Sequence, residues 1–225
     1  MTPREFEQQL EDIQKTQPGL SGCASSDGFQ ISGRFILNHS ANGIPLYEEY
    51  SIQIEIPSSF PDSFPKVMET SGLIPEGFDH VNPDKYLCLA ANCEIAALLD
   101  KTPTLVAFID ELVTSYLYSA AYYAKYRICP FGERPHGIKG LKVAYADRYA
   151  ADTDDVLLPL LGYVSGKLAY RGHTPCPCHS GKRLRECHGK VALADIKSPR
   201  CAVYRDDATL ILYDMYCDWR EKNGK

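Results

Sequence analysis

Residues 80–89 read His-Val-Asn-Pro-Asp-Lys-Tyr-Leu-Cys-Leu, so a cysteine follows a turn-forming run. Asn82-Pro83-Asp84 predicts the turn, because Asn, Pro and Asp all favour turn conformations. Cys88 lies six residues after Asn82, between two leucines. A thiol on a short irregular segment, with an amide donor nearby, is typical of a nucleophile. Cys88 is therefore the candidate nucleophile; the alternative is a buried structural cysteine, since free Cys packs like a small hydrophobic residue.

The flanking segments predict an α+β fold. Upstream, Tyr50-Ser-Ile-Gln-Ile-Glu-Ile56 alternates apolar and polar side chains, as a strand with one buried face does. Prolines spread over residues 57–75 exclude a regular helix there. Elsewhere apolar residues recur at helical spacing. The expected elements are a helix over 2–16, strands over 29–37, 46–56 and 67–70, a tyrosine-rich helix over 104–126, and further helices over 141–151, 154–165 and 206–222.

The first half of the chain resembles a known family. An apolar strand, the element Phe60-Pro-Asp-Ser-Phe-Pro65, the triplet His80-Val81-Asn82 and the pair Cys88-Leu89 before a helix are similar to the core of ubiquitin-conjugating enzymes. The resemblance covers residues 1–127 and implies the α+β UBC fold. Val81 replaces the proline of the family's His-Pro-Asn triplet, and the separation between Asn82 and Cys88 is two residues shorter than usual, as in a divergent bacterial relative.

By that resemblance, Cys88 forms a thioester with the C-terminal glycine of a protein and passes the acyl group to an amine. Asn82 either donates a hydrogen bond to the oxyanion of the tetrahedral intermediate or is a turn residue. His80 either supports the turn through a backbone hydrogen bond or takes part in proton transfer. Asp84 is a candidate for orienting the amine, and His136 lies on a glycine-flanked loop that would fold back over the thiol.

A second motif, Thr174-Pro-Cys-Pro-Cys-His-Ser-Gly-Lys-Arg-Leu-Arg-Glu-Cys-His-Gly189, predicts a metal site. Three thiolates and one imidazole suit tetrahedral zinc, and a polar segment of this length needs a metal to fold. The expected ligands are Cys176, Cys178, Cys187 and His188. The motif resembles SEC-C, the zinc-binding tail of the bacterial preprotein-translocase ATPase, except that His179 replaces a common glycine. Basic residues around it indicate either a solvated rim or docking to an acidic partner.

Composition limits the functional classes. The chain has 225 residues and a net charge of −5, which does not favour general nucleic-acid binding. No apolar run approaches the ~20 residues that span a membrane, and the N-terminus carries no secretory segment. We therefore expect a cytoplasmic protein with no membrane partner. The nine cysteines are not spaced like a disulfide framework, so metal binding and catalysis explain them better.

These observations predict four parts: a UBC-like catalytic domain over 1–128, a helical extension over 129–170, a zinc module over 171–190 and a helical tail over 191–225. The tail's helix either packs on the main domain or binds a partner. The resemblance extends to the conjugating component of CBASS antiphage operons, which implies a cyclic-oligonucleotide synthase as the protein whose C-terminus is conjugated, and a separate activating enzyme. The alternatives are a non-catalytic interaction protein and a thiol hydrolase that removes conjugates.

Overall fold

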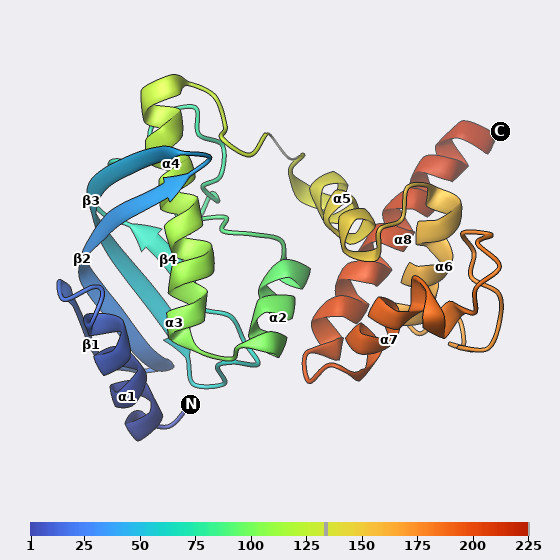
Figure 1. Cartoon of the computed structure of the whole chain (residues 1–225), viewed down its shortest axis with the longest axis horizontal. Helices are drawn as coiled ribbons and strands as arrows, with labels where there is room; N and C mark the ends of the chain where they lie inside the picture. The colour runs from blue at the N-terminus through green and yellow to red at the C-terminus, as the bar shows by residue number, and fades with distance from the viewer. Residues whose placement is uncertain (133–134, 225) are drawn as a thin grey trace. The chain divides into compact units, whose positions relative to one another are not determined.

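The structure is a computed structural model that describes residues 1–132 and 135–224 (Figure 1). It is an α+β fold with a four-stranded antiparallel sheet and helices. By its contacts the chain forms two units, Met1–Ala90 with Lys101–Glu133, and Ala91–Asp100 with Arg134–Lys225. None of the helices in the described ranges is long and apolar enough to cross a membrane.

The first unit contains the sheet, whose strands follow one another in the order β1-β2-β3-β4. Each pair is antiparallel, as expected for strands joined by short turns. Phe29 of one strand pairs with Ile56 of the next, and Phe35 pairs with Tyr50, so large buried side chains share one face. The strands are β1 (Leu20–Ser25), β2 (Gly28–Ala41), β3 (Ile44–Pro57) and β4 (Lys66–Glu69).

Two helical segments cover the apolar face of the sheet (Figure 1). Helix α1 (Pro3–Gln14) begins with a capping box between Thr2 and Glu5, and its Phe6 ring stacks on Phe29 with the centroids 4.4 Å apart. On the long helix, the Tyr118 hydroxyl donates to the carbonyl of Ile44 at 2.9 Å. The hydrophobic core of this unit therefore lies between the sheet and these helices.

The long helix contains a π-helical turn. It runs through α3 (Leu105–Phe108), the π turn η1 (Ile109–Val113) and α4 (Thr114–Tyr126), and it ends at Arg127 with φ 59°. A π turn holds one extra residue and rotates the helix that follows. Leu105 before the turn, Val113 within it and Tyr116 after it are consequently all buried.

The second unit is helical. Its elements are α2 (Asn92–Lys101), α5 (Gly137–Tyr149), α6 (Asp154–Val164), the short 3₁₀ turn η2 (Leu184–Glu186), α7 (Gly189–Lys197) and α8 (Cys201–Asn223). Hydrogen bonds and ion pairs between buried or partly buried side chains connect these helices. Arg148 pairs with Asp195, whose carboxylate also accepts from Tyr149. Arg200 and Ser198 both bind Asp100, which ties α2 to the start of α8.

The predicted helices and strands are confirmed, with bounds that differ by a few residues. Among the described residues, β1, α2, the 3₁₀ turn η2 and α7 were not predicted. Strand β1 is short and mostly exposed, and α2 and α7 are short helices beside stronger motifs. Residues 91–100 group with the C-terminal unit, whereas the sequence placed them in the domain over 1–128. Within this unit an ion pair joins Asp100 of α2 to Arg200 beside α8, and no local pattern indicates it.

Candidate functional site

Residues 80–88 form a small hairpin in the first unit, and Cys88 ends it. The Cys88 N–H donates to the His80 carbonyl at 2.8 Å, and Val81 pairs with Leu87 in an antiparallel bridge. At the tip, the Asn82 N–H donates to the Tyr86 carbonyl at 2.9 Å. The expected turn is therefore present, and it brings His80 and Cys88 side by side through their backbones.

Contacts to the sheet hold the second limb of the hairpin. The Leu87 N–H donates to the Val67 carbonyl of β4 at 2.7 Å, and the Leu87 side chain is buried. The Tyr86 hydroxyl donates to Glu55 of β3 at 2.7 Å, and the Lys66 ammonium lies 4.9 Å from the centre of the Tyr86 ring. The residues that precede Cys88 are thus fixed to two strands.

Helix α4 holds the first limb. The Tyr116 hydroxyl donates to the His80 carbonyl at 3.0 Å, so this carbonyl accepts from both Tyr116 and Cys88. The Phe78 ring packs edge-on against His80 and against Tyr116, with centroids 5.0 and 5.5 Å apart. An aromatic cluster therefore supports the peptide bond that positions the thiol.

Cys88 is exposed as a residue, but the protein around its sulfur desolvates it, which raises the pKa of the thiol above its ordinary value. Burial chiefly raises the pKa of Tyr116, and negative charge on Cys88 adds to the effect, so the hydroxyl and the sulfur are electrostatic neighbours. Among the described residues no hydrogen bond reaches the Cys88 sulfur. The thiol is accessible, and its desolvation disfavours the thiolate.

The other predicted site residues lie in two places. Asn82 is at the hairpin tip with an exposed side chain, and its backbone serves the turn. The Asp84 carboxylate accepts from the Tyr86 N–H at 3.4 Å, which is also a turn contact. His136 precedes α5 in the second unit. Its loop includes Glu133 and Arg134, which lie outside the described residues.

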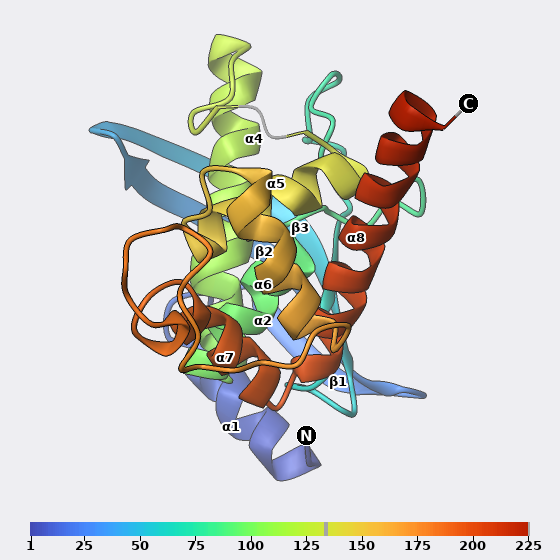
Figure 2. The same cartoon turned by 90° about the vertical axis from the view of Figure 1, so that its right-hand side faces the viewer.

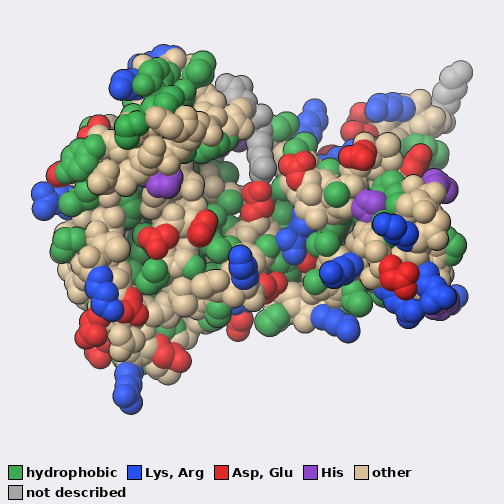
Figure 3. Space-filling view, in the orientation of Figure 1, with side chains coloured by type: hydrophobic (Ala, Val, Ile, Leu, Met, Phe, Trp, Pro, Cys, Tyr) green, Lys and Arg blue, Asp and Glu red, His purple; other side chains and the backbone are tan. Residues whose placement is uncertain are grey.

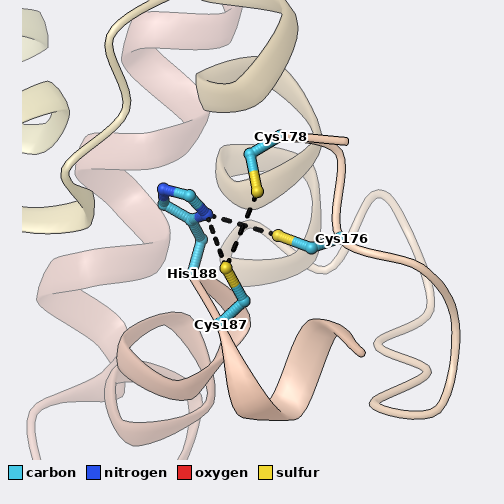
Figure 4. A group of neighbouring side chains, drawn as sticks. All are labelled: Cys176, Cys178, Cys187 and His188. Atoms are coloured by element: carbon cyan, nitrogen blue, oxygen red, sulfur yellow. Dashed lines mark hydrogen bonds between the residues drawn. The ribbon is translucent and has the colours of Figure 1, made fainter. Parts of the chain in front are cut away.

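A second cluster brings together the side chains of Cys176, Cys178, Cys187 and His188, whose ligand atoms all lie within 4.8 Å of one another. Figure 4 shows the three sulfurs and one imidazole nitrogen pointing at a common centre. The Cys178 and Cys187 sulfurs are 3.6 Å apart, and the Cys176 sulfur is 3.3 Å from His188 Nδ1. These four residues could hold a metal ion.

A short hairpin builds this cluster. Pro175 pairs with Arg183, and the Cys176 N–H donates to the Lys182 carbonyl at 2.9 Å. The turn needs a left-handed residue, and His179 adopts φ 57° there. Glycine enters that conformation without steric cost, which accounts for the glycine common at this position in the similar motif.

The geometry fits a tetrahedral metal. Zinc–sulfur bonds of about 2.3 Å place tetrahedral sulfurs about 3.8 Å apart, close to the observed separation. His188 Nε2 contacts the Ala150 carbonyl at 3.0 Å, which leaves Nδ1 for the metal. The Cys178 pKa is lowered to about 6, first by its side-chain hydrogen bond with Ser180, so the thiolate is readily formed. With all four positions taken by protein, the site would be structural.

The segment over residues 171–190, which contains the Cys and His cluster, carries exposed basic side chains. Figure 3 shows Lys and Arg side chains gathered over the end of the second unit where this loop lies. Only one acid accompanies them, and it pairs with Arg185 at 3.5 Å. The exposed basic residues of this surface are Arg171, Lys182, Arg183, Arg185 and Lys190.

The remaining cysteines have no comparable setting. All nine cysteines lie within the described ranges, and none of them forms a disulfide bond. Cys93 is fully buried, and burial raises its pKa to about 12, so it is a structural residue. Cys23 is exposed on β1, so a Cys23 variant is a suitable control for a Cys88 variant.

Sequence reasoning missed Tyr86 and Tyr116 as parts of the Cys88 site. Tyr116 was one of several tyrosines on a helix whose apolar spacing indicated core packing, and nothing in the pattern singled it out. Tyr86 lies inside the motif itself, two residues before Cys88. That position was a usable signal, because residues two apart in an extended limb lie on the same face.

Comparison with known proteins gives no match: no family model matches the chain, and neither a curated protein nor a solved structure is significantly similar to it.

Proposed function

We propose that the first unit is a ubiquitin-conjugating-like acyltransferase whose nucleophile is Cys88. The observation that carries the proposal is the accessible thiol at the end of a hairpin that hydrogen bonds hold to β3, β4 and α4. A rigid support with an exposed thiol suits a large acyl donor, because a protein C-terminus must reach the sulfur and a second protein must then reach the thioester.

The element order supports the same proposal. A helix, a four-stranded antiparallel meander, an irregular Cys88 segment and further helices are what the resemblance to the UBC fold implies.

The proposed reaction has two steps. In the first, the Cys88 sulfur attacks the activated carbonyl carbon of a protein C-terminus; its S–H proton goes to solvent, and the thiolate of a separate activating enzyme leaves. In the second, an amine attacks the thioester carbonyl, a C–N bond forms, the C–S bond breaks and Cys88 leaves as the thiolate. The amine loses its extra proton to solvent.

Residues of the hairpin have distinct roles in this scheme. The His80 carbonyl holds the Cys88 backbone in place. The Asn82 side chain is the donor proposed for the oxyanion, because it is exposed at the tip of the same hairpin. The four ligands of the second unit would hold zinc, which would supply a structural crosslink there.

The class of substrate follows from the resemblance to conjugating components of CBASS antiphage operons. On that proposal the acyl donor is the C-terminus of a cyclic-oligonucleotide synthase, and conjugation ligates or regulates that enzyme. No residue of the site by itself selects this donor, so the substrate is the first point to test.

The test is a non-reducing gel and intact-mass measurement on the full chain, expressed with the proteins encoded beside its gene. Wild type is expected to carry an adduct that thiol reductant removes. Cys88→Ala is expected to lose it, and Cys88→Ser to retain an adduct that reductant does not remove, because an oxygen ester replaces the thioester. Cys23→Ala is the matched control, an exposed cysteine of the same unit.

The alternatives give different results. A non-catalytic interaction protein would form a complex with a neighbouring protein that survives Cys88→Ala and never becomes covalent. A thiol hydrolase needs a base hydrogen-bonded to the sulfur, and the described residues provide none.

A further inference from the structure

The exposed side of helix α8 carries an apolar stripe with a charge at each end. Its large side chains are unusually accessible: Leu210 is 45% exposed, Tyr213 66% and Tyr216 52%. The fully buried residues of this helix all lie between Tyr204 and Ile211, so its second half is anchored less deeply. In Figure 2 the last turns of α8 extend beyond the helices of its own unit. Exposed aromatic rows of this kind mark interaction surfaces.

The charges at the two ends are opposite and equally spaced. Asp206 lies seven residues before Tyr213, and Arg220 lies seven residues after it. Seven residues are about two helical turns, so the three side chains share one face. Within the described chain neither Asp206 nor Arg220 forms an ion pair; the guanidinium of Arg220 lies 5.9 Å from the centre of the Tyr216 ring.

We propose that this α8 stripe, defined as Asp206, Leu210, Tyr213, Tyr216 and Arg220, binds the same stripe of a second copy in antiparallel orientation. Reversing the helix direction about Tyr213 exchanges Asp206 with Arg220, so each copy places its acid opposite the partner copy's base. The two apolar halves meet in between. A twofold interface needs this kind of self-complementary surface.

The charge pattern selects the antiparallel arrangement. In a parallel pair Asp206 would face Asp206 and Arg220 would face Arg220, and like charges in contact oppose association. In the antiparallel pair both contacts are attractive. The stripe lies on the side of α8 opposite to Ile211, which is buried within the unit, so pairing does not disturb the fold.

Charge reversal tests the proposal on the full chain. Asp206→Arg alone and Arg220→Asp alone each create two like-charge contacts per dimer. Each should raise the dimer dissociation constant about tenfold or more in sedimentation equilibrium. An equimolar mixture of the two single variants should recover the dimer, because in the mixed pair both contacts are again between opposite charges.

The control is Lys222→Asp, an exposed charge on the same helix but about half a turn around from Tyr213. It should leave the dissociation constant unchanged. A wild type that stays monomeric at every concentration would overturn the proposal. A mixture that dimerises no better than the single variants would overturn it as well. Neither outcome depends on Cys88, so this test is independent of the acyltransferase proposal.

Discussion

The Tyr116 hydroxyl and the Cys88 N–H donate to the same acceptor, the carbonyl oxygen of His80, at 3.0 and 2.8 Å. A residue of the long helix and the candidate nucleophile are therefore joined through one peptide bond. This relationship makes Tyr116 a positioning residue for Cys88, although the two are far apart in the sequence.

Tyr116→Phe should weaken that support without opening a large cavity. We expect the free energy of unfolding to fall by about 1 kcal/mol, the usual contribution of one hydrogen bond. Thioester formation at Cys88 should slow by about tenfold, because the hairpin is less well positioned. Denaturant titration and a time course on non-reducing gels measure the two effects. Tyr122→Phe, on the same helix, is the control; equal effects of the two variants would refute the role of Tyr116.

The reactivity of Cys88 should depend on pH in a characteristic way. Because desolvation raises the pKa of the thiol, its alkylation by iodoacetamide should keep increasing at pH values above the ordinary thiol midpoint of about 8.5. Peptide mapping by mass spectrometry follows the modification of Cys88 separately from the other cysteines. A midpoint near or below neutrality would instead indicate an activated thiolate and would contradict the electrostatics described above.

Metal removal should unfold the module around Cys176–His188. Structural zinc sites contribute about 10–16 kcal/mol to the folding of zinc-finger peptides, so loss of a ligand has a large local effect. We expect one equivalent of zinc in the purified protein, and its loss in Cys178→Ala. Elemental analysis and protease sensitivity of residues 172–189 measure this. His173→Gln changes an exposed neighbour and should keep the metal; zinc retained by Cys178→Ala would show that the ligand set is wrong.

Asp207 should make stability depend on pH. Burial raises its pKa to about 6, whereas an unfolded Asp titrates near 3.9. The folded state therefore binds the proton more tightly, and this contribution to stability, present at low pH, is lost as the pH rises through about 6. Asp207→Asn should raise the free energy of unfolding at pH 7 by about 1–3 kcal/mol and flatten the profile between about pH 4 and 7.

Urea unfolding at several pH values checks this prediction. Asp218→Asn, an exposed carboxylate on the same helix, is the control and should change stability by less than about 0.5 kcal/mol. A variant Asp207→Asn that is less stable than wild type at pH 7 would mean that the buried carboxylate is charged and satisfied by its hydrogen bond from Tyr145.

Removing only one partner of the Arg200–Asp100 ion pair should lower the stability of the protein more than removing both partners. Arg200 is buried and bonds to Asp100 at 2.6 Å. Arg200→Met should destabilise the protein by about 3 kcal/mol, because it leaves a partly buried carboxylate without its cation. The double variant Asp100→Asn with Arg200→Met should recover most of this loss in thermal unfolding, because the neutral amide oxygen can still accept from Ser198 and Tyr204. Additive losses in the double variant would contradict the pairwise explanation.

Local patterns predicted much of this fold. The alternation over Tyr50–Ile56 and the spacing of apolar residues on the long helix follow directly from which side chains are buried. The Cys and His spacing of the second motif predicted a cluster, and the structure brings those side chains together. Tertiary relationships could not be predicted this way. The bond from Tyr116 to His80 and the bond from Arg200 to Asp100 join residues 36 and 100 positions apart, and no single-sequence pattern connects them.

The placement of α2 also has a consequence during synthesis. Asp100 leaves the ribosome one hundred residues before its partner Arg200. At a synthesis rate of about 5–20 residues per second, about 5–20 s pass between the synthesis of α2 and that of Arg200. A helix of ten residues is too short to be stable alone. The nascent chain can therefore complete the sheet and the long helix while α2 is still an unfolded loop, and this loop is closed only when the last helix is made.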